Sequence, residues 1–203
     1  MPGVSQPEVV GLLLAAGAGR RMGSPKALLR HPDGEAWVSR AARILAAGGC
    51  DPVLVVLGAA AEQVRPLVPA GFAVVVADDW DEGMGASLRC GLTALLDQPT
   101  LLDQPPGVQA VLIGLVDTPG VSAEVVARLR AALTGPDGLA RAAYAGVPGH
   151  PVLIGSAHWR AAAQAASGDT GARGYLAGRA VTLVECGDLG FGDDVDLPVG
   201  PGR

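Results

Sequence analysis

Short apolar runs recur along the chain, and a longer segment with helical spacing separates each run from the next. The runs are rich in Val and Leu and lack the alternating polar residues of a half-exposed strand. They lie at Val9–Leu14, Val53–Leu57, Phe72–Ala77, Ala110–Val116, Val152–Ile154 and Val181–Val184. Because strands covered on both faces are continuously apolar, this pattern predicts an α/β fold with three αβα layers, Rossmann-like, around a mostly parallel sheet.

Helix signals lie between these runs. Trp37–Ala47 has helical spacing and ends at a Gly-Gly pair, and Ser122 stands where an N-cap is expected. Two further helices are expected, at Ala59–Val68 and Met84–Leu96. The alternation continues through all 203 residues without a break, so we expect a single domain over residues 1–203.

Composition and charge argue against several classes of protein. The formal net charge is −5 and no basic run occurs, so we expect no nucleic-acid partner and no membrane surface held by charge. The longest apolar stretch, Val9–Gly19, is too short to cross a bilayer, and the first eight residues do not resemble a signal peptide. These features predict a cytoplasmic protein.

The cysteines and histidines show no pattern of a disulfide framework or a metal site. The three cysteines are odd in number and far apart, which favours reduced side chains in the core; they are Cys50, Cys90 and Cys186. The three histidines lack metal-ligand spacing, and no Ser-His-Asp or Cys-His arrangement is visible. We therefore expect no nucleophilic side chain in the mechanism.

A loop rich in glycine and cations follows the first apolar run, in the stretch LLLAAGAGRRMGSPKALL (residues 12–29). A loop between a strand and a helix can present backbone N–H groups to an anion. The spacing does not fit a dinucleotide-binding fingerprint, because Gly23 comes one residue late and the second strand ends at Gly58 without an acidic residue. A Walker loop does not fit either, since no serine or threonine follows Lys26.

The loop does match Leu-Ala-Ala-Gly-x-Gly-x-Arg-Met-Gly-x-Pro-Lys, and through this motif the chain resembles the MobA-like NTP transferases. The matching residues are Leu14, Ala15, Ala16, Gly17, Gly19, Arg21, Met22, Gly23, Pro25 and Lys26. The resemblance implies that the glycines let the backbone close around a triphosphate. Arg21 and Lys26 would offset negative charge on the phosphates and on the departing pyrophosphate. Arg20 occupies a variable position of the motif.

Carboxylates for a divalent cation are expected at strand ends. Asp117 ends the run AVLIGLVD and precedes Thr118, at the place where the family carries Asp-Gln-Pro after a strand. Near the carboxy terminus, DVDLP supplies Asp194 and Asp196 where the family carries a longer acidic motif. The resemblance implies that Mg²⁺ binds Asp117 and one of this pair, and which one stays open.

The tripeptide Asp-Gln-Pro itself occurs in the duplicated stretch LLDQPTLLDQPP, at Asp97 and Asp103. These aspartates follow a helix and a loop instead of a strand, so we expect both to lie away from the phosphates. The duplication, with its prolines, predicts a lengthened surface loop.

Two further segments carry the resemblance toward the other substrates. GMGASLRCG resembles a family segment that meets the nucleotide base, which implies that Ser87 binds nucleotide; capping of the helix start is an open alternative. GHPV and GDTGAR match the molybdenum cofactor cytidylyltransferase branch and imply acceptor binding by Gly149, His150 and Arg173. Arg173 would pair with the acceptor's terminal phosphate, beside Gly149 and His150 on a tight turn. For His150 a packing role stays open.

Over about Val9–Pro198, the resemblance implies transfer of a nucleoside monophosphate from an NTP to a phosphorylated acceptor, with release of pyrophosphate and with Mg²⁺ as cofactor. CTP is favoured because Ala16 and Pro25 stand where guanylyl-transferring relatives carry glycine and an acidic residue. The acceptor implied by the branch is molybdopterin carrying molybdenum, and a molybdoenzyme would receive the product.

Three alternatives remain open at this point. One is a related transferase that uses GTP or another phosphorylated acceptor. A second is a non-catalytic carrier of nucleotide or molybdenum cofactor, suggested by Thr118 and by the motif lost after Pro198. The third, an NAD-binding oxidoreductase, is disfavoured by the glycine spacing.

Overall fold

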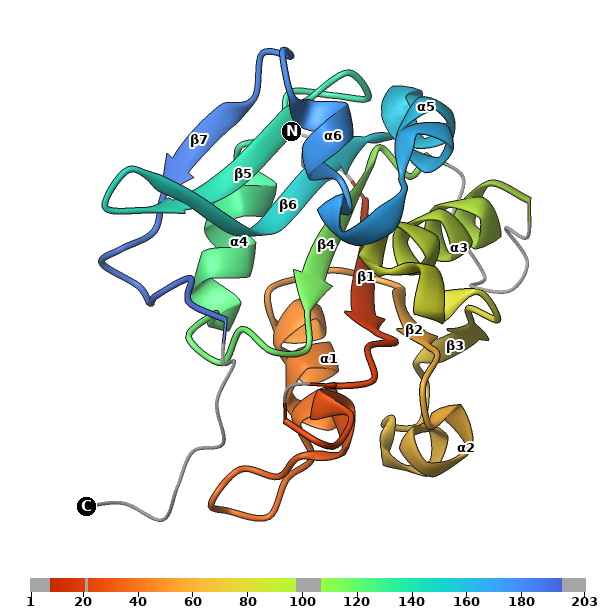
Figure 1. Cartoon of the computed structure of the whole chain (residues 1–203). Helices are drawn as coiled ribbons and strands as arrows, with labels where there is room; N and C mark the ends of the chain where they lie inside the picture. The colour runs from red at the N-terminus through yellow and green to blue at the C-terminus, as the bar shows by residue number, and fades with distance from the viewer. Residues whose placement is uncertain (1–7, 21, 98–106, 195–203) are drawn as a thin grey trace.

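The computed structural model describes residues 8–20, 22–97 and 107–194, and within them seven strands form one sheet. The strands are β1 (Val9–Ala15), β2 (Val53–Leu57), β3 (Ala73–Val76), β4 (Ala110–Leu115), β5 (Leu139–Tyr144), β6 (Val147–Gly155) and β7 (Thr182–Glu185). Their order is β3-β2-β1-β4-β6-β5-β7, and only β6 runs antiparallel to its neighbours. The predicted mostly parallel α/β sheet is confirmed (Figure 1).

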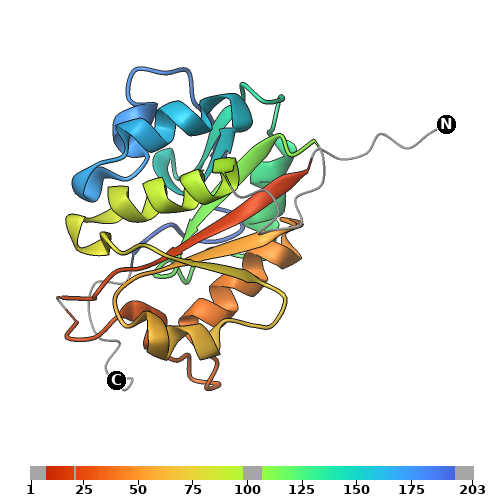
Figure 2. The same ribbon diagram turned by 90° about the vertical axis from the view of Figure 1, so that its right-hand side faces the viewer.

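Helices cover both faces of the sheet. They are α1 (Trp37–Ala47), α2 (Ala61–Val64), α3 (Met84–Asp97), α4 (Ala123–Ala131), α5 (Trp159–Ala165) and α6 (Arg173–Leu176). Short 3₁₀ turns are η1 (Lys26–Leu28), η2 (Arg65–Leu67), η3 (Trp80–Glu82), η5 (Ser156–His158) and η6 (Gly168–Thr170). Helices α3, α5 and α6 pack on one face, while α1 and α4 pack on the other with α2 beside them (Figure 2).

Burial of the central strands explains why the apolar runs predicted them correctly. Every residue of β1, β2 and β4 is buried, since these strands lie in the middle of the sheet under helices on both faces. The two edge strands are different: β3 is half-buried and β7 is mostly exposed. The expectation that all the runs are covered on both faces is therefore wrong for the sheet edges.

The largest differences from the sequence expectations lie in the second half of the sheet. Strand β5 was not predicted, and β6 is much longer than the expected run. The expected helix at Ala59–Val68 divides into α2 and the 3₁₀ turn η2, because Pro66 lacks the N–H that an α-helix needs. The Ser122 cap is confirmed: its Oγ accepts a hydrogen bond from the Val125 N–H at 3.4 Å.

Other expectations have simple outcomes. The part of the chain that the structure describes contains no helix long and apolar enough to cross a membrane. The three cysteines are free, and burial raises the pKa of the Cys50 thiol to about 12, as expected of a packed thiol. The duplicated segment 98–106 lies outside the described residues, whereas Asp97 is described and ends α3.

Candidate functional site

The order of the strands places a cleft beside the first loop. The chain passes from β1 outward through β2 and β3, then returns to the other side of β1 as β4. In open α/β sheets such a reversal leaves a crevice at the carboxyl ends of the strands, where ligands bind. Here a cleft of about 330 Å³ opens at that point, lined by the loop after β1, the end of β4 and the start of α3. Its lining residues include Ala16, Gly17, Gly19, Lys26, Trp80, Ser87, Asp117 and Asp169.

The loop after β1 has one glycine that the backbone requires and one that faces open space. Gly19 has φ of +60°, and a β-carbon there would lie 1.8 Å from the carbonyl oxygen of Ser24. Its own carbonyl accepts hydrogen bonds from Met22 and Gly23, at 2.8 and 2.9 Å. A β-carbon on Gly17 would meet no atom within 4 Å. The loop is therefore tight at Gly19 and leaves a free surface toward the cleft at Gly17.

Lys26 and Asp117 meet in this cleft. Lys26 opens the 3₁₀ turn η1, Asp117 follows the end of β4, and Lys26 Nζ donates to Asp117 Oδ2 at 2.7 Å. Their side chains are 15% and 21% exposed, so water screens the pair only partly. The structure thus brings two of the predicted catalytic residues together from opposite sides of the sheet's reversal point.

Thr118 differs from the glutamine of the family motif, and its hydroxyl is satisfied within the protein. The residue is buried, and its Oγ1 donates to the carbonyl of Leu115 at 3.0 Å. Thr118 closes the end of β4 and leaves the adjacent carboxylate facing the cleft.

The cleft continues toward the start of α3. Ser87 is the fourth residue of α3, so the capping alternative is wrong, and its buried side chain lines the cleft. Gly58 allows Trp80 to pack closely, because a β-carbon on Gly58 would lie 2.6 Å from that of Trp80. Arg89, two residues after Ser87, forms salt bridges to Asp79 at 2.5 Å and to Glu82 at 2.9 Å.

The expected acceptor residues lie on β6 and α6. Gly149 and His150 are in strand β6, so their placement on a tight turn is wrong; the turn is at Ala145 and Gly146, with φ of 51° and 78°. Arg173 is exposed and opens α6. The charges of Asp117 and Arg173 both act on the pKa of His150, Asp117 raising it and Arg173 lowering it.

His150 is neutral at ordinary pH. Burial, and to a smaller extent the positive charge of Arg141, lower its pKa to about 4. Its Nδ1 is fully buried and has no hydrogen-bond partner among the described residues. A buried imidazole nitrogen without a partner points to a ligand that completes it.

Sequence reasoning missed two residues. Arg141 in β5 donates from Nε to the carbonyl of Gly149 at 2.7 Å. Asp169 in η6 lines the cleft and packs beside Gly83. Asp169 carried a usable signal, because it lies inside the GDTGAR motif, whereas Arg141 lies in a strand that was not predicted.

Two of the three predicted metal ligands lie among the described residues. Asp117 faces the cleft, and Asp194 is exposed in the segment after β7. Asp196 and the predicted catalytic Arg21 lie outside the described residues. Residues 8–20, 22–97 and 107–194 hold no cluster of three His, Cys, Asp or Glu side chains that could bind a metal. Of the three predicted metal ligands, Asp117 is the one that lines the cleft among the described residues.

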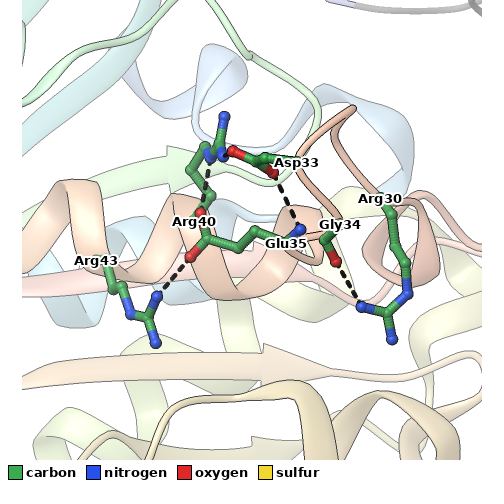
Figure 3. A network of polar contacts seen from close by, with 6 residues as sticks. All are labelled: Arg30, Asp33, Gly34, Glu35, Arg40 and Arg43. Atoms are coloured by element: carbon green, nitrogen blue, oxygen red, sulfur yellow. Dashed lines mark hydrogen bonds and ion pairs between the residues drawn. The ribbon is translucent and has the colours of Figure 1, made fainter.

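A network of charges fixes the chain that follows Lys26 (Figure 3). Arg40 in α1 donates to Glu35 at 2.8 Å and also bonds to Asp33, and Arg43 binds the same Glu35 at 2.7 Å. These contacts hold the loop 30–36 against α1. The Arg40 guanidinium keeps the pKa of Glu35 below its usual range. Because η1 connects directly to this loop, the network supports the position of the Lys26 backbone.

Comparison with known proteins matches residues 11–183 to the MobA-like NTP transferase domain. "Nicotine blue oxidoreductase" of Paenarthrobacter nicotinovorans is 38% identical, over 94% of this chain and 93% of that protein. A "Probable molybdenum cofactor guanylyltransferase" of Rhodopirellula baltica is 38% identical over 36% of each chain. Among solved structures, a homologue of Mycobacterium tuberculosis Rv0371c from Mycobacterium sp. strain JC1 superposes with a TM-score of 0.76. It is 29% identical, over 93% of this chain and 90% of that one.

Proposed function

This chain belongs to the MobA-like NTP transferase family, and from that premise we propose that it transfers CMP from CTP to molybdopterin carrying molybdenum, releasing pyrophosphate. The observation that carries the proposal is the Lys26–Asp117 ion pair, set beside the open face of Gly17 at the reversal point of the sheet. A cation, a carboxylate and free backbone in one cleft suit the binding of a triphosphate and its charge.

In the proposed mechanism the loop binds the triphosphate through its backbone N–H groups, with Lys26 beside the phosphates. A phosphate oxygen of the acceptor attacks the α-phosphorus, and the bond between that phosphorus and the bridging oxygen of pyrophosphate breaks. The electron pair leaves with pyrophosphate, whose added negative charge Lys26 and Arg21 offset. Catalysis then consists of positioning and charge stabilisation.

Asp117 suits Mg²⁺. Its carboxylate already accepts one cation, the Lys26 ammonium, and Mg²⁺ is commonly held by one or two carboxylates together with substrate phosphates. Asp117 would hold the metal with Asp194 or Asp196 and with oxygens of the triphosphate. Bound Mg²⁺ supplies positive charge at the α-phosphate and at pyrophosphate. Asp117 would fix that position, and the Lys26 ammonium lies beside it in the same cleft.

Support for CTP comes from the residues at Ala16 and Pro25, and support for the acceptor comes from the motifs at His150 and Arg173. The partial similarity to a molybdenum cofactor guanylyltransferase is in keeping with a molybdopterin acceptor. Asp169 and Ser87, both on the lining of the cleft, are suited to bind the sugar or base of the nucleotide.

The test is pyrophosphate release from CTP, GTP, ATP and UTP, each with and without molybdenum cofactor, and with Mg²⁺ added or chelated. Asp117→Asn should abolish release, whereas Asp97→Asn is the matched control, because that aspartate also precedes Gln-Pro but ends α3. Release from CTP that needs the cofactor and Asp117 would support the proposal. Normal cofactor transfer to a molybdoenzyme by Asp117→Asn would instead indicate a carrier.

A second candidate comes from the relative named nicotine blue oxidoreductase, which matches along nearly the whole chain. A redox activity toward a dye of that kind is testable directly. Oxidation of NADH or NADPH by nicotine blue is followed by absorbance, without any NTP. Activity there that survives Asp117→Asn, together with no pyrophosphate release, would replace the transferase by an oxidoreductase. The end of β2 disfavours the oxidoreductase. No acidic side chain stands there to bind the ribose of a dinucleotide, and Trp80 packs on Gly58 at that position.

A further inference from the structure

Two arginines from different elements carry charges that act on His150. Arg141 lies in β5 and Arg173 opens α6, and both act electrostatically on His150. The side chains also influence each other, because the positive charge of Arg173 adds to burial in lowering the pKa of Arg141. The charges of the three groups are therefore coupled, and the hydrogen bond from Arg141 to Gly149 places Arg141 next to the His150 backbone.

One nitrogen of the Arg141 guanidinium is hydrogen-bonded within the protein, and its other N–H groups can still donate to a ligand. Its Nε donates to the Gly149 carbonyl at 2.7 Å, which leaves the two terminal nitrogens of the guanidinium. Within residues 8–20, 22–97 and 107–194, no carboxylate forms an ion pair with Arg141 or Arg173. A half-buried cation beside another cation is unfavourable unless an anion joins them.

The backbone around the pair is held in place. The Tyr144 hydroxyl donates to the His150 carbonyl at 2.8 Å, and burial raises the pKa of this phenol to about 12, so it stays a donor. Tyr144 and Arg141 thus fix the carbonyls of two successive residues, Gly149 and His150. The His150 Nδ1 has no partner among the described residues and is available to a ligand.

We propose that Arg141 and Arg173 form a phosphomonoester subsite, in which His150 Nδ1 accepts an O–H or N–H of the same ligand. Two guanidiniums match the geometry and charge of a phosphate dianion better than one. The proposal rests on the proposed function for the identity of the ligand, namely the acceptor that carries the phosphate. The new element is Arg141, which lies outside the family motifs and would be the second arginine to bind the phosphate.

The experiment follows the ring signals of the three histidines by ¹H–¹⁵N NMR during titration with inorganic phosphate and with methyl phosphate. His150 reports on this subsite. Because Asp117 of the cleft also acts on His150, the Arg141→Gln variant is what separates binding here from phosphate in the nucleotide loop, whose described cleft lining does not contain Arg141. The variants are Arg141→Gln, Arg141→Lys and a matched control, Arg160→Gln, which removes an exposed arginine of α5. Unfolding in urea checks each variant for loss of stability.

We expect saturable His150 shifts in the wild type and in Arg160→Gln. Arg141→Gln should weaken the apparent affinity by about tenfold to a hundredfold, as for loss of a charged hydrogen-bond pair, with Arg141→Lys in between. In the transferase assay, Arg141→Gln should raise KM for the acceptor and leave KM for the nucleotide unchanged, a split that a purely structural role would not produce.

Failure of this subsite and failure of the proposed function give different results. If His150 does not respond to either phosphate, or responds equally in Arg141→Gln, the subsite is wrong even when pyrophosphate release is normal. If His150 responds as expected but no NTP yields pyrophosphate, the subsite stands and the proposed reaction is wrong.

Discussion

The buried His150 predicts a defined loss of stability in acid. Its folded-state pKa of about 4 lies below the ordinary value of 6.5, so between these pH values the unfolded chain binds a proton that the folded chain refuses. Stability is therefore full above pH 6.5 and falls as the pH drops toward 4. A shift of this size, at about 1.36 kcal/mol per pKa unit, corresponds to a loss of about 3 kcal/mol at pH 4.

The measurement is the free energy of unfolding in urea at pH values from 7 to 4, for the wild type and for His150→Gln. Carboxylates with lowered pKa values, such as Glu35 and Asp188, also lose their contribution in acid, but they do so in both proteins. The difference between the two curves isolates His150. We expect the variant to be less sensitive to acid by most of this loss of about 3 kcal/mol; parallel curves would refute the assignment of a buried neutral imidazole.

Four further outcomes are expected. Gly19→Ala should destabilise the loop by more than about 1 kcal/mol in urea unfolding, because an alanine at positive φ is strained and its β-carbon clashes with backbone. Gly17→Ala should leave stability unchanged but weaken CTP binding in calorimetry; equal CTP affinity would show that the triphosphate lies elsewhere. Lys26→Met should lower kcat for pyrophosphate release about 10²- to 10³-fold, and a fall below tenfold would remove it from the catalytic group. Arg40→Gln should cause a small decrease in Tm that becomes smaller at high salt, since its ion pairs are partly exposed; a decrease unchanged by salt would contradict this.

The strands in the first half of the sheet could be predicted from the sequence for a physical reason. Strands β1, β2 and β4 are buried on both faces, so selection against polar residues leaves an unbroken apolar signal. The meeting of Lys26 with Asp117 also follows from general rules, because carboxyl ends of neighbouring parallel strands share one edge. Distances and burial within the cleft required the structure.

The second half was harder to read. Strand β5, LARAAY, has no β-branched residue, so its propensity does not indicate a strand. Strand β6 contains Pro148 and Pro151, which suggested a turn. The structure resolves this conflict, because β6 pairs with β4 only from Val152 onward, and both prolines lie where the strand extends past β4. Arg141 was missed for the same reason as its strand.

The charge pair in the cleft ties substrate binding to the order in which the chain folds. Lys26 and Asp117 are 91 positions apart, and the contact exists only when β4 has docked against β1. Contacts of such long sequence separation form late, after the entropy of closing a large loop has been lost. A nascent chain that has emerged only as far as α3 presents the glycine loop without its carboxylate partner. Under the proposed function, recognition of a triphosphate by both partners of this pair would therefore wait until the middle of the sheet is built.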